Sequence, residues 1–171
     1  MRKLSNAERK KIAIYIKNKI DISPFIEGFY LSNEDFSNAI ISNTTIFNQT
    51  VKNTNFSNAI IGSKEKITVI TGNTFINCNF KAAVFPHTVY FRRNKCHSCS
   101  FDEAFMPFVE YQYTDFDNAC TFCDVNFRLG SRIGLGAKFG NRCLGELSKF
   151  WSVVLVDKEE YEKLLRKVLN E

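Results

Sequence analysis

The chain of 171 residues has no long apolar run and little equipment for acid–base chemistry. No stretch approaches the ~18 apolar residues of a membrane span, and the first residues run into a charged segment rather than an apolar signal region. We therefore expect a cytoplasmic protein, in which the six Cys residues are thiols rather than disulfides. Two His residues leave few candidates for a general acid or base.

Proline and glycine are scarce as well. The chain has three Pro and eight Gly residues, and 44% of its residues are hydrophobic and 24% are charged. These values exclude a collagen-like chain and an intrinsically disordered one. A length of 171 residues is close to the usual size of one domain, so we expect a single core with small elements at its ends.

The sequence does have a period of five. A large apolar residue stands at every fifth position for eight repeats: Ile26, Leu31, Phe36, Ile41, Ile46, Val51, Phe56 and Ile61. A helix would spread these residues over all its faces, and a strand has a period of two, so neither explains the pattern. The residues two positions earlier are mostly small or polar, as at Ala39 and Thr44. We expect the large and the small residue of each unit to point inward.

Asparagine marks the corners between these units. It recurs two positions after the apolar residues, at Asn38, Asn43, Asn48, Asn53 and Asn58. Asn tolerates positive φ, and its side chain can bond nearby backbone, so it suits a turn. Each unit is therefore predicted to be a short extended side followed by a corner, and four sides close one coil of about twenty residues.

These units resemble the motif of the pentapeptide-repeat family, which is a small residue, Asn or Asp, Leu or Phe, and two variable residues. The matching stretches are Thr54-Asn55-Phe56-Ser57-Asn58, Cys78-Asn79-Phe80, Cys99-Ser100-Phe101 and Thr114-Asp115-Phe116-Asp117-Asn118. The resemblance covers residues 26–131. It implies an all-β solenoid, a right-handed quadrilateral β-helix.

Residues one coil apart should stack, which predicts two ladders inside the solenoid. The small residues of one ladder are Ala39, Ala59, Cys78, Cys99 and Cys120. The large residues of the other are Ile41, Ile61, Phe80, Phe101 and Phe122. The period slips twice, so residues 62–66 and the segment around Pro86 are predicted to be loops or bulges.

The open ends of a solenoid expose unpaired backbone and should be capped. Ser5-Asn6-Ala7-Glu8 is a capping box, followed at helical spacing by Ile12, Tyr15, Ile16 and Ile20. Residues 1–25 are therefore predicted to form an N-terminal capping helix. Residues 132–171 are predicted to form an irregular segment and a C-terminal capping helix, which begins at a second box, Asp157-Lys158-Glu159-Glu160.

The segment of residues 150–156, before the C-terminal helix, is uncharged and strand-prone. It contains Phe150, Trp151 and Val154, and as an exposed edge it would be prone to aggregate. Either the C-terminal helix or a second subunit must cover it. The family resemblance implies a twofold dimer through this end, and a symmetric interface is a common way to bury such a patch, so we expect the dimer.

Four Cys residues have nearly the spacing of a zinc site, C-x2-C-x20-C-x2-C: Cys96, Cys99, Cys120 and Cys123. The period of five places Cys99 and Cys120 inside, Cys96 on a neighbouring side and Cys123 outside. Four sulfurs on different sides cannot readily form a tetrahedron, so we interpret them as small buried residues and expect no metal or cofactor. His97 should point away from Cys96, so nucleophilic catalysis is not favoured either.

Charge is distributed unevenly along the chain. Residues 1–25 and 128–171 are net basic, while residues 26–127 are net acidic. Residues 101–127 contain no Lys or Arg but six acidic residues, the candidate partner-binding set: Asp102, Glu103, Glu110, Asp115, Asp117 and Asp124. Their density is locally similar to that of duplex DNA, which carries one charge per ~1.7 Å. A solvated acidic surface is the alternative interpretation.

We therefore expect a non-enzymatic scaffold that presents flat faces to a protein partner. Some members of the family that the repeats resemble are thought to inhibit or protect type II topoisomerases by resembling DNA. This gives a first alternative, in which the acidic residues bind a type II topoisomerase or another DNA-binding protein. In the second alternative, basic residues bind nucleic acid or anionic lipid: Arg9, Lys10, Lys11, Arg92, Arg93, Arg128, Arg132 and Arg142.

Overall fold

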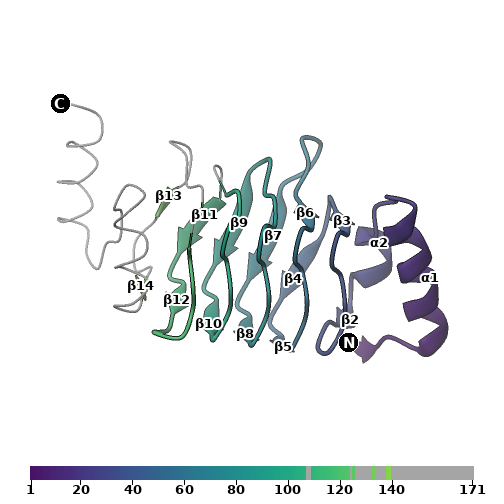
Figure 1. Cartoon of the computed structure of the whole chain (residues 1–171), viewed down its shortest axis with the longest axis horizontal. Helices are drawn as coiled ribbons and strands as arrows, with labels where there is room; N and C mark the ends of the chain where they lie inside the picture. The colour runs from purple at the N-terminus through teal and green to yellow at the C-terminus, as the bar shows by residue number, and fades with distance from the viewer. Residues whose placement is uncertain (107–108, 124, 126–131, 134–137, 140–171) are drawn as a thin grey trace.

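The computed structural model describes residues 1–106, 109–123, 125, 132–133 and 138–139. This part of the chain is a parallel β-solenoid, in which short strands stack along one axis and two helices lie at the N-terminal end (Figure 1). All strand pairings in this part of the chain are parallel. Each joins residues one coil apart, except the pairing of the N-terminal strand, residues 2–3, with residues 29–30. The solenoid predicted from the period of five is confirmed.

The coil has four faces, two of which are continuous sheets. Face 2 consists of β4 (Thr45–Phe47), β7 (Thr68–Thr71), β9 (Val89–Arg92), β11 (Val109–Gln112) and β13 (Arg132–Ile133). Face 3 consists of β5 (Thr50–Lys52), β8 (Thr74–Ile76), β10 (Lys95–His97), β12 (Asp115–Phe116) and β14 (Lys138–Phe139).

The other two faces are held largely by single β-bridges. Face 1 begins with β3 (Ile40–Ile41) and β6 (Ile60–Ile61) and continues through bridges to Val84 and Phe105. Face 4 is a column of bridged residues: Asp35, Asn55, Asn79, Ser100 and Thr121. The chain passes through faces 4, 1, 2 and 3 in turn, so face 1 lies opposite face 3.

The core is a stack of aromatic and aliphatic side chains. On face 4, Phe80 lies between Phe56 and Phe101, with ring centroids 4.8 and 4.9 Å apart and interplanar angles of 6° and 4°. Phe101 continues the stack onto Phe122 at 5.0 Å. Each fully buried Phe side chain contributes roughly 1.5–3 kcal/mol, so this interior can hold a narrow structure together.

A buried polar ladder runs beneath the corner between faces 2 and 3. Its members are the inward residues Gln49, Asn73, Asn94 and Thr114. The Asn94 amide donates to the Ile70 carbonyl at 2.9 Å and accepts from the Asn73 backbone N–H at 2.9 Å. These groups are therefore satisfied without water, as buried polar groups must be.

The Asn corners are confirmed at four of the five predicted positions. Asn38, Asn48, Asn53 and Asn58 have φ between 48° and 60°, in the left-handed region that Asn tolerates. Asn43 does not have positive φ, so its prediction as an equivalent corner is wrong. Its backbone N–H bonds to Ser23 Oγ in α2 (Ser23–Ile26) at 3.0 Å, so the N-terminal cap sets this corner.

The predicted stacking of residues in the two ladders is wrong between the coil of Ala59 and the coil of Cys78. Ile60 pairs with Val84, which places Ala59 next to Ala83 on face 1. Cys78 instead follows Thr54 on face 4, since Asn79 pairs with Asn55, 24 residues earlier. The reason is the loop predicted at residues 62–66, which extends to residue 67 and adds residues outside the coil. The large residues stacked on face 4 are accordingly Phe36, Phe56, Phe80, Phe101 and Phe122.

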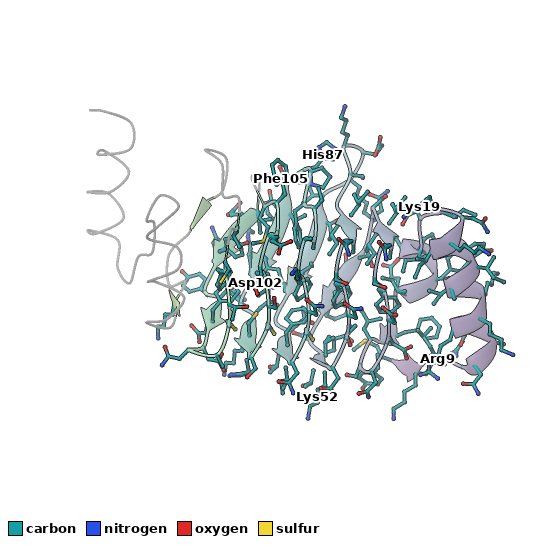
Figure 2. The ribbon with its side chains drawn as sticks, viewed as in Figure 1. Arg9, Lys19, Lys52, His87, Asp102 and Phe105 are labelled. Carbon is teal, nitrogen blue, oxygen red and sulfur yellow. The ribbon has the colours of Figure 1, made fainter. Side chains whose placement is uncertain are left out.

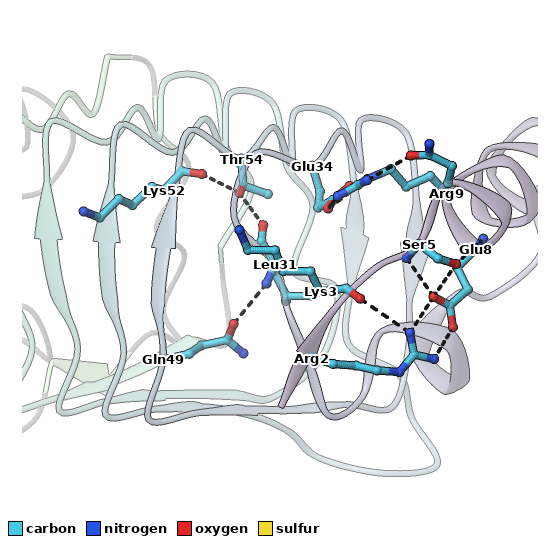
Figure 3. Close-up of polar contacts among 11 residues, drawn as sticks. Arg2, Lys3, Ser5, Glu8, Arg9, Leu31, Glu34, Gln49, Lys52 and Thr54 are labelled. Carbon is cyan, nitrogen blue, oxygen red and sulfur yellow. Dashed lines mark hydrogen bonds and ion pairs between the residues drawn. The ribbon is translucent and has the colours of Figure 1, made fainter.

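The N-terminal cap contains the predicted helix and an additional strand pair. In α1 (Asn6–Lys17) the capping box is formed: Glu8 N–H donates to Ser5 Oγ at 3.3 Å, and Ser5 N–H donates to Glu8 Oε2 at 2.8 Å (Figure 3). Ile20 lies beyond the helix and is 45% exposed, so its prediction as part of the apolar stripe is wrong. The additional pair is β1 (Arg2–Lys3) with β2 (Phe29–Tyr30).

The C-terminal predictions lie outside the described residues. They are the capping helix, its box and the segment with Phe150, Trp151 and Val154.

Candidate functional site

The acidic residues that are contiguous in the sequence lie on different faces of the solenoid. Glu110 is on face 2, Asp115 and Asp117 are on face 3, and Asp102 points outward from face 4, as Figure 2 shows among the side chains. Glu103 follows at the next corner, with φ of 60°. Asp124 lies outside the described residues. The five described carboxylates therefore do not form one acidic face.

Basic groups compensate part of this charge. Glu110 accepts from Arg92 at 2.7 Å, and the Arg92 guanidinium lies over the Tyr90 ring at 3.9 Å. Glu103 pairs with Lys81 at 2.9 Å. On face 3, the strand register places Asp115 between Lys95 and Lys138. The charges alternate along these faces, so they do not reproduce the continuous negative charge of DNA.

The remaining two carboxylates accept hydrogen bonds from backbone. Asp102 accepts from Cys123 N–H at 2.8 Å and from the Thr121 hydroxyl at 2.9 Å. Partial burial alone would raise the pKa of Asp117, but bonds from groups that include the Ser98 N–H outweigh it and hold this pKa below its usual value. Both side chains are thus held against the solenoid surface.

The basic residues that the structure describes do not gather into one patch either. Arg9 of α1 binds Glu34 through two guanidinium nitrogens, with the shortest contact 2.6 Å, at the N-terminal end (Figure 3). Lys10 is exposed on the same helix, while the Lys11 ammonium lies over the Tyr15 and Phe25 rings. Arg93 occupies a corner beside face 2. Arg128 and Arg142, and the side chain of Arg132, lie outside the described residues.

The four cysteines with near-zinc-site spacing are placed inside and outside the coil as predicted. Cys78, Cys96, Cys99 and Cys120 are buried, and Cys123 is exposed. Contacts with the Cys120, Cys78 and Cys96 thiols raise the pKa of Cys99, and burial raises that of Cys96, so both are protonated at neutral pH. Within the described ranges, no group of three His, Cys, Asp or Glu side chains is arranged to hold a metal ion.

A cavity of about 530 Å³ lies between α1 and the first coil of face 4. Apolar side chains such as Ile12 and Phe36 line it together with the Arg9–Glu34 pair. The Glu34 side chain is only 5% exposed and both of its oxygens accept from Arg9, so the charge of this carboxylate is neutralised by the pair. The cavity is therefore a gap under the cap rather than a reactive centre.

Face 1 carries a feature that the sequence analysis missed, an uncharged row of apolar side chains. The row consists of Ile40, Ile60, Val84 and Phe105, one from each successive coil, which we call the apolar row. Ile60 is 41% exposed, and the other three are half-buried. The second outward position of this face holds Ser42, Gly62 and Pro86, so its described outward residues from Ile40 onward carry no charge, while Asp21 precedes them in the column.

The signal for this row was present in the sequence. Each member directly precedes an inward residue: Ile41, Ile61, Phe85 and Met106. On the other faces the same position holds polar or charged residues in most coils, such as Asn55 on face 4 and Lys95 on face 3. The row could have been found once the correct coil register was known.

The loop of residues 62–67 borders the apolar row. Gly62 begins it with φ of 108°, a conformation that L side chains rarely adopt, and lets the chain leave face 1. Ser63, Lys64, Ile67, His87 and Thr88 line a shallow depression of about 340 Å³ at its base. Figure 2 shows His87 and Phe105 along the same edge of the molecule.

Neither a protein-family model nor a curated protein sequence matches this chain. Among solved structures, it is similar to trypsin-treated QnrB1, described as a plasmid-mediated fluoroquinolone resistance protein, with 14% sequence identity and a TM-score of 0.14. The match covers 75% of this chain and 89% of that chain. A similarity of this size carries no argument, so function must be argued from the surface of the chain itself. No helix in the described part is long and apolar enough to cross a membrane.

Proposed function

We propose that the chain is a non-enzymatic scaffold of the pentapeptide-repeat type that binds a protein partner through face 1. The observation that carries this proposal is the apolar row, with Ile40, Ile60 and Val84 in register on a face whose described outward residues from Ile40 onward carry no charge. Large side chains presented to water at a regular spacing are typical of interaction sites rather than of solvated surfaces. The scaffold offers this row on a rigid backbone.

The acidic residues support binding less well, because the bound partner would have to meet several faces at once. Arg92 and Lys81 already pair with Glu110 and Glu103. A DNA-mimic function toward a type II topoisomerase or another DNA-binding protein would use Asp102, Glu103, Glu110, Asp115, Asp117 and Asp124. Variants that change charged residues distinguish this alternative from the main proposal. They also distinguish the binding of nucleic acid or anionic lipid by the basic residues.

The proposal is tested by affinity capture from cytosol with three forms of the full chain. Ile60→Asp introduces a charge into the apolar row, and Thr50→Asp introduces the same charge at an exposed position of face 3. We expect one protein to be retained by the wild type and Thr50→Asp but lost with Ile60→Asp. Retention by all three forms would contradict a role for face 1.

Two further variants test the alternatives in the same assay. If Glu103→Gln combined with Asp102→Asn removes the captured protein while Ile60→Asp does not, the acidic residues carry binding. Binding through the basic residues predicts instead that capture declines steeply with salt and that the retained material includes nucleic acid or lipid. A partner bound through the apolar row should be retained as the salt concentration rises.

A C-terminal dimer is also part of this proposal. The uncharged segment with Phe150, Trp151 and Val154 supports it, because such a segment needs a cover. Light scattering on the wild type and on Trp151→Glu tests it. A wild type that scatters as a monomer of 19.7 kDa would refute the dimer.

A further inference from the structure

The backbone of face 1 has no room for an added strand. Ile60 N–H donates to Ala39 O and Val84 N–H donates to Ala59 O, both at 2.8 Å. Phe105 N–H donates to Ala83 O at 2.9 Å. The donors and acceptors of the face are thus used between coils, so a partner can meet it only through side chains. The partner segment must satisfy its own backbone, as an α-helix does.

The spacing of the apolar row suits a single helix. Stacked coils are ~4.8 Å apart, so four row members span roughly 14 Å. Apolar residues at i, i+4, i+7 and i+11 of a helix span roughly 16 Å, so one helix stripe can follow the row with a small crossing angle. A helix is also ~10 Å wide, close to the length of one extended side of the coil.

The charges at the border of face 1 are mainly basic. Lys64 and Lys66 stand in the loop beside the row, and neither ammonium lies within ion-pair distance of a described carboxylate. Glu65 lies between them, but hydrogen bonds from its own backbone and from Ser63 hold the pKa of its carboxyl below its usual value and tie it to the loop. Lys19 lies at the N-terminal end of the same edge (Figure 2).

The acidic groups near this border are already engaged. Asp21 precedes Ile40 in the face 1 column, and its Oδ1 accepts from Ser23 N–H at 2.9 Å and from Ser42 N–H at 3.1 Å. Glu103, at the corner between faces 4 and 1, pairs with Lys81. An incoming segment therefore meets, beside the apolar row, two ammonium groups that form no ion pair and one carboxylate, Glu65, that is tied to the loop, so this border is net basic.

We infer that the segment bound by face 1 is an amphipathic helix whose apolar stripe is flanked by Asp and Glu residues. This inference rests on the proposed function and names the chemistry of the partner. The apolar row, chiefly Ile40, Ile60 and Val84, binds the stripe, and Lys64 and Lys66 select the acidic flank. Charge of this kind at the edge of an interface sets specificity and association rate more than affinity.

The test is selection from a displayed library of 18-residue peptides, with the full chain as the target. The library combines a fixed helical stripe with flanks randomised between Asp, Glu, Lys, Arg, Ser and Thr, and an equal share of members has strand-type alternation. We expect helical members with acidic flanks to be enriched. Their affinity for Ile60→Asp should fall at least tenfold, as for a central interface residue, and stay unchanged for Thr50→Asp.

A second pair of variants separates the charges from the row. Lys64→Glu combined with Lys66→Glu should weaken the selected peptides severalfold and slow their association, while Lys52→Glu on face 3 should not. Enrichment of basic or strand-type peptides, peptides indifferent to Ile60→Asp, or an empty selection would each overturn the inference. Self-association of the wild type that Ile60→Asp abolishes would also overturn it, because face 1 would then bind a second copy.

These outcomes are distinct from a failure of the proposed function. If capture from cytosol depends on Ile60 but the captured partner has no acidic amphipathic helix, face 1 binds a protein and only the inferred chemistry is wrong. If capture does not depend on Ile60, the proposed function itself fails.

Discussion

Faces 1 and 3 lie on opposite sides of one core, but their surfaces differ in kind. From Ile40 onward, face 1 presents the apolar row and no charged outward side chain among its described residues. Face 3 presents Lys52, Lys95, His97, Asp115 and Asp117, with Lys138 continuing the same ladder. Inside, both faces bury large residues, such as Phe85 and Phe75.

The difference shows which positions the fold determines. Inward residues must fill a narrow interior, so every face buries large apolar residues beside small or polar ones. Outward residues contact solvent, and the coil does not require them to be of any one type. Folding therefore does not require the contrast between the two faces, and this is the ground on which we propose that face 1 binds a partner.

The largest expected effect tests the shared interior. Phe75→Ala and Phe85→Ala should each lower the free energy of unfolding by ~3–5 kcal/mol, because the neighbouring coils cannot close the cavity left by a ring. Val84→Ala, one residue from Phe85 but outward, should change it by less than about 0.5 kcal/mol. Urea unfolding measures all three. Similar losses at positions 84 and 85 would contradict the inward and outward assignment.

A second difference between the faces is buried. Face 3 has the polar residue Asn94 as its second inward residue, whereas face 1 has Ala83 and Ala104. Asn94→Ala should cost about 1–3 kcal/mol, since it removes the acceptor of the Asn73 N–H and a donor to the Ile70 carbonyl. Urea unfolding measures this loss, and Asn118→Ala at an exposed corner is the control, whose free energy of unfolding should hardly change. If Asn94→Ala lowered the free energy of unfolding as little as Asn118→Ala does, water would have replaced the lost hydrogen bonds.

The fold could be predicted from the sequence because the inward pattern is strictly local. Each unit of five residues carries its own large residue and, in the first coils, its own Asn corner, so the period is visible without knowledge of contacts. The coil register could not be predicted in the same way. Residues 62–67 leave the coil, and the sequence does not show whether extra residues lengthen a side or loop out, so Cys78 was assigned to the wrong ladder.

The same geometry explains why the candidate site differed from the sequence hypothesis. A step of five residues moves the chain to the next face, so acidic residues close in sequence, such as Glu110, Asp115 and Asp102, separate in space. The members of the apolar row, by contrast, are about 20 residues apart and meet only through stacking. Their pattern becomes visible only when the register is correct.

The acid stability of the protein should depend on face 3 and not on face 1. Partial burial opposes ionisation of Asp117, but the N–H groups of Ser98 and Ala119 stabilise the carboxylate, so its folded pKa lies below the unfolded value of about 3.9. This contribution is complete above the unfolded pKa and is lost as the pH falls through the folded pKa. Asp117→Asn should therefore flatten the fall in stability below about pH 4.

Urea unfolding at a series of pH values measures this change. Val84→Ala is the control, because the described outward positions of face 1 from Ile40 onward hold no carboxylate, and its stability should follow the wild-type pH dependence. An unchanged slope in Asp117→Asn would mean that its hydrogen bonds persist equally in the unfolded chain.

The smallest expected effect concerns the charge ladder itself. Asp115 lies in register with Lys95 on one side and Lys138 on the other. Asp115→Lys would place three ammonium groups in adjacent coils, ~4.8 Å apart along the axis, and should cost about 0.2–1 kcal/mol for each opposed pair. This spacing is shorter than the Debye length of ~10 Å at 0.1 M salt and exceeds that of ~3 Å at 1 M, so high salt should remove most of the loss.

Val84→Lys on face 1 provides the matched charge without charged neighbours in its row, and its stability should not depend on salt in this way. Urea unfolding of both variants at 0.05 and 1 M salt decides the point: a loss in Asp115→Lys that salt does not reduce would show that packing, rather than charge, distinguishes face 3 from face 1.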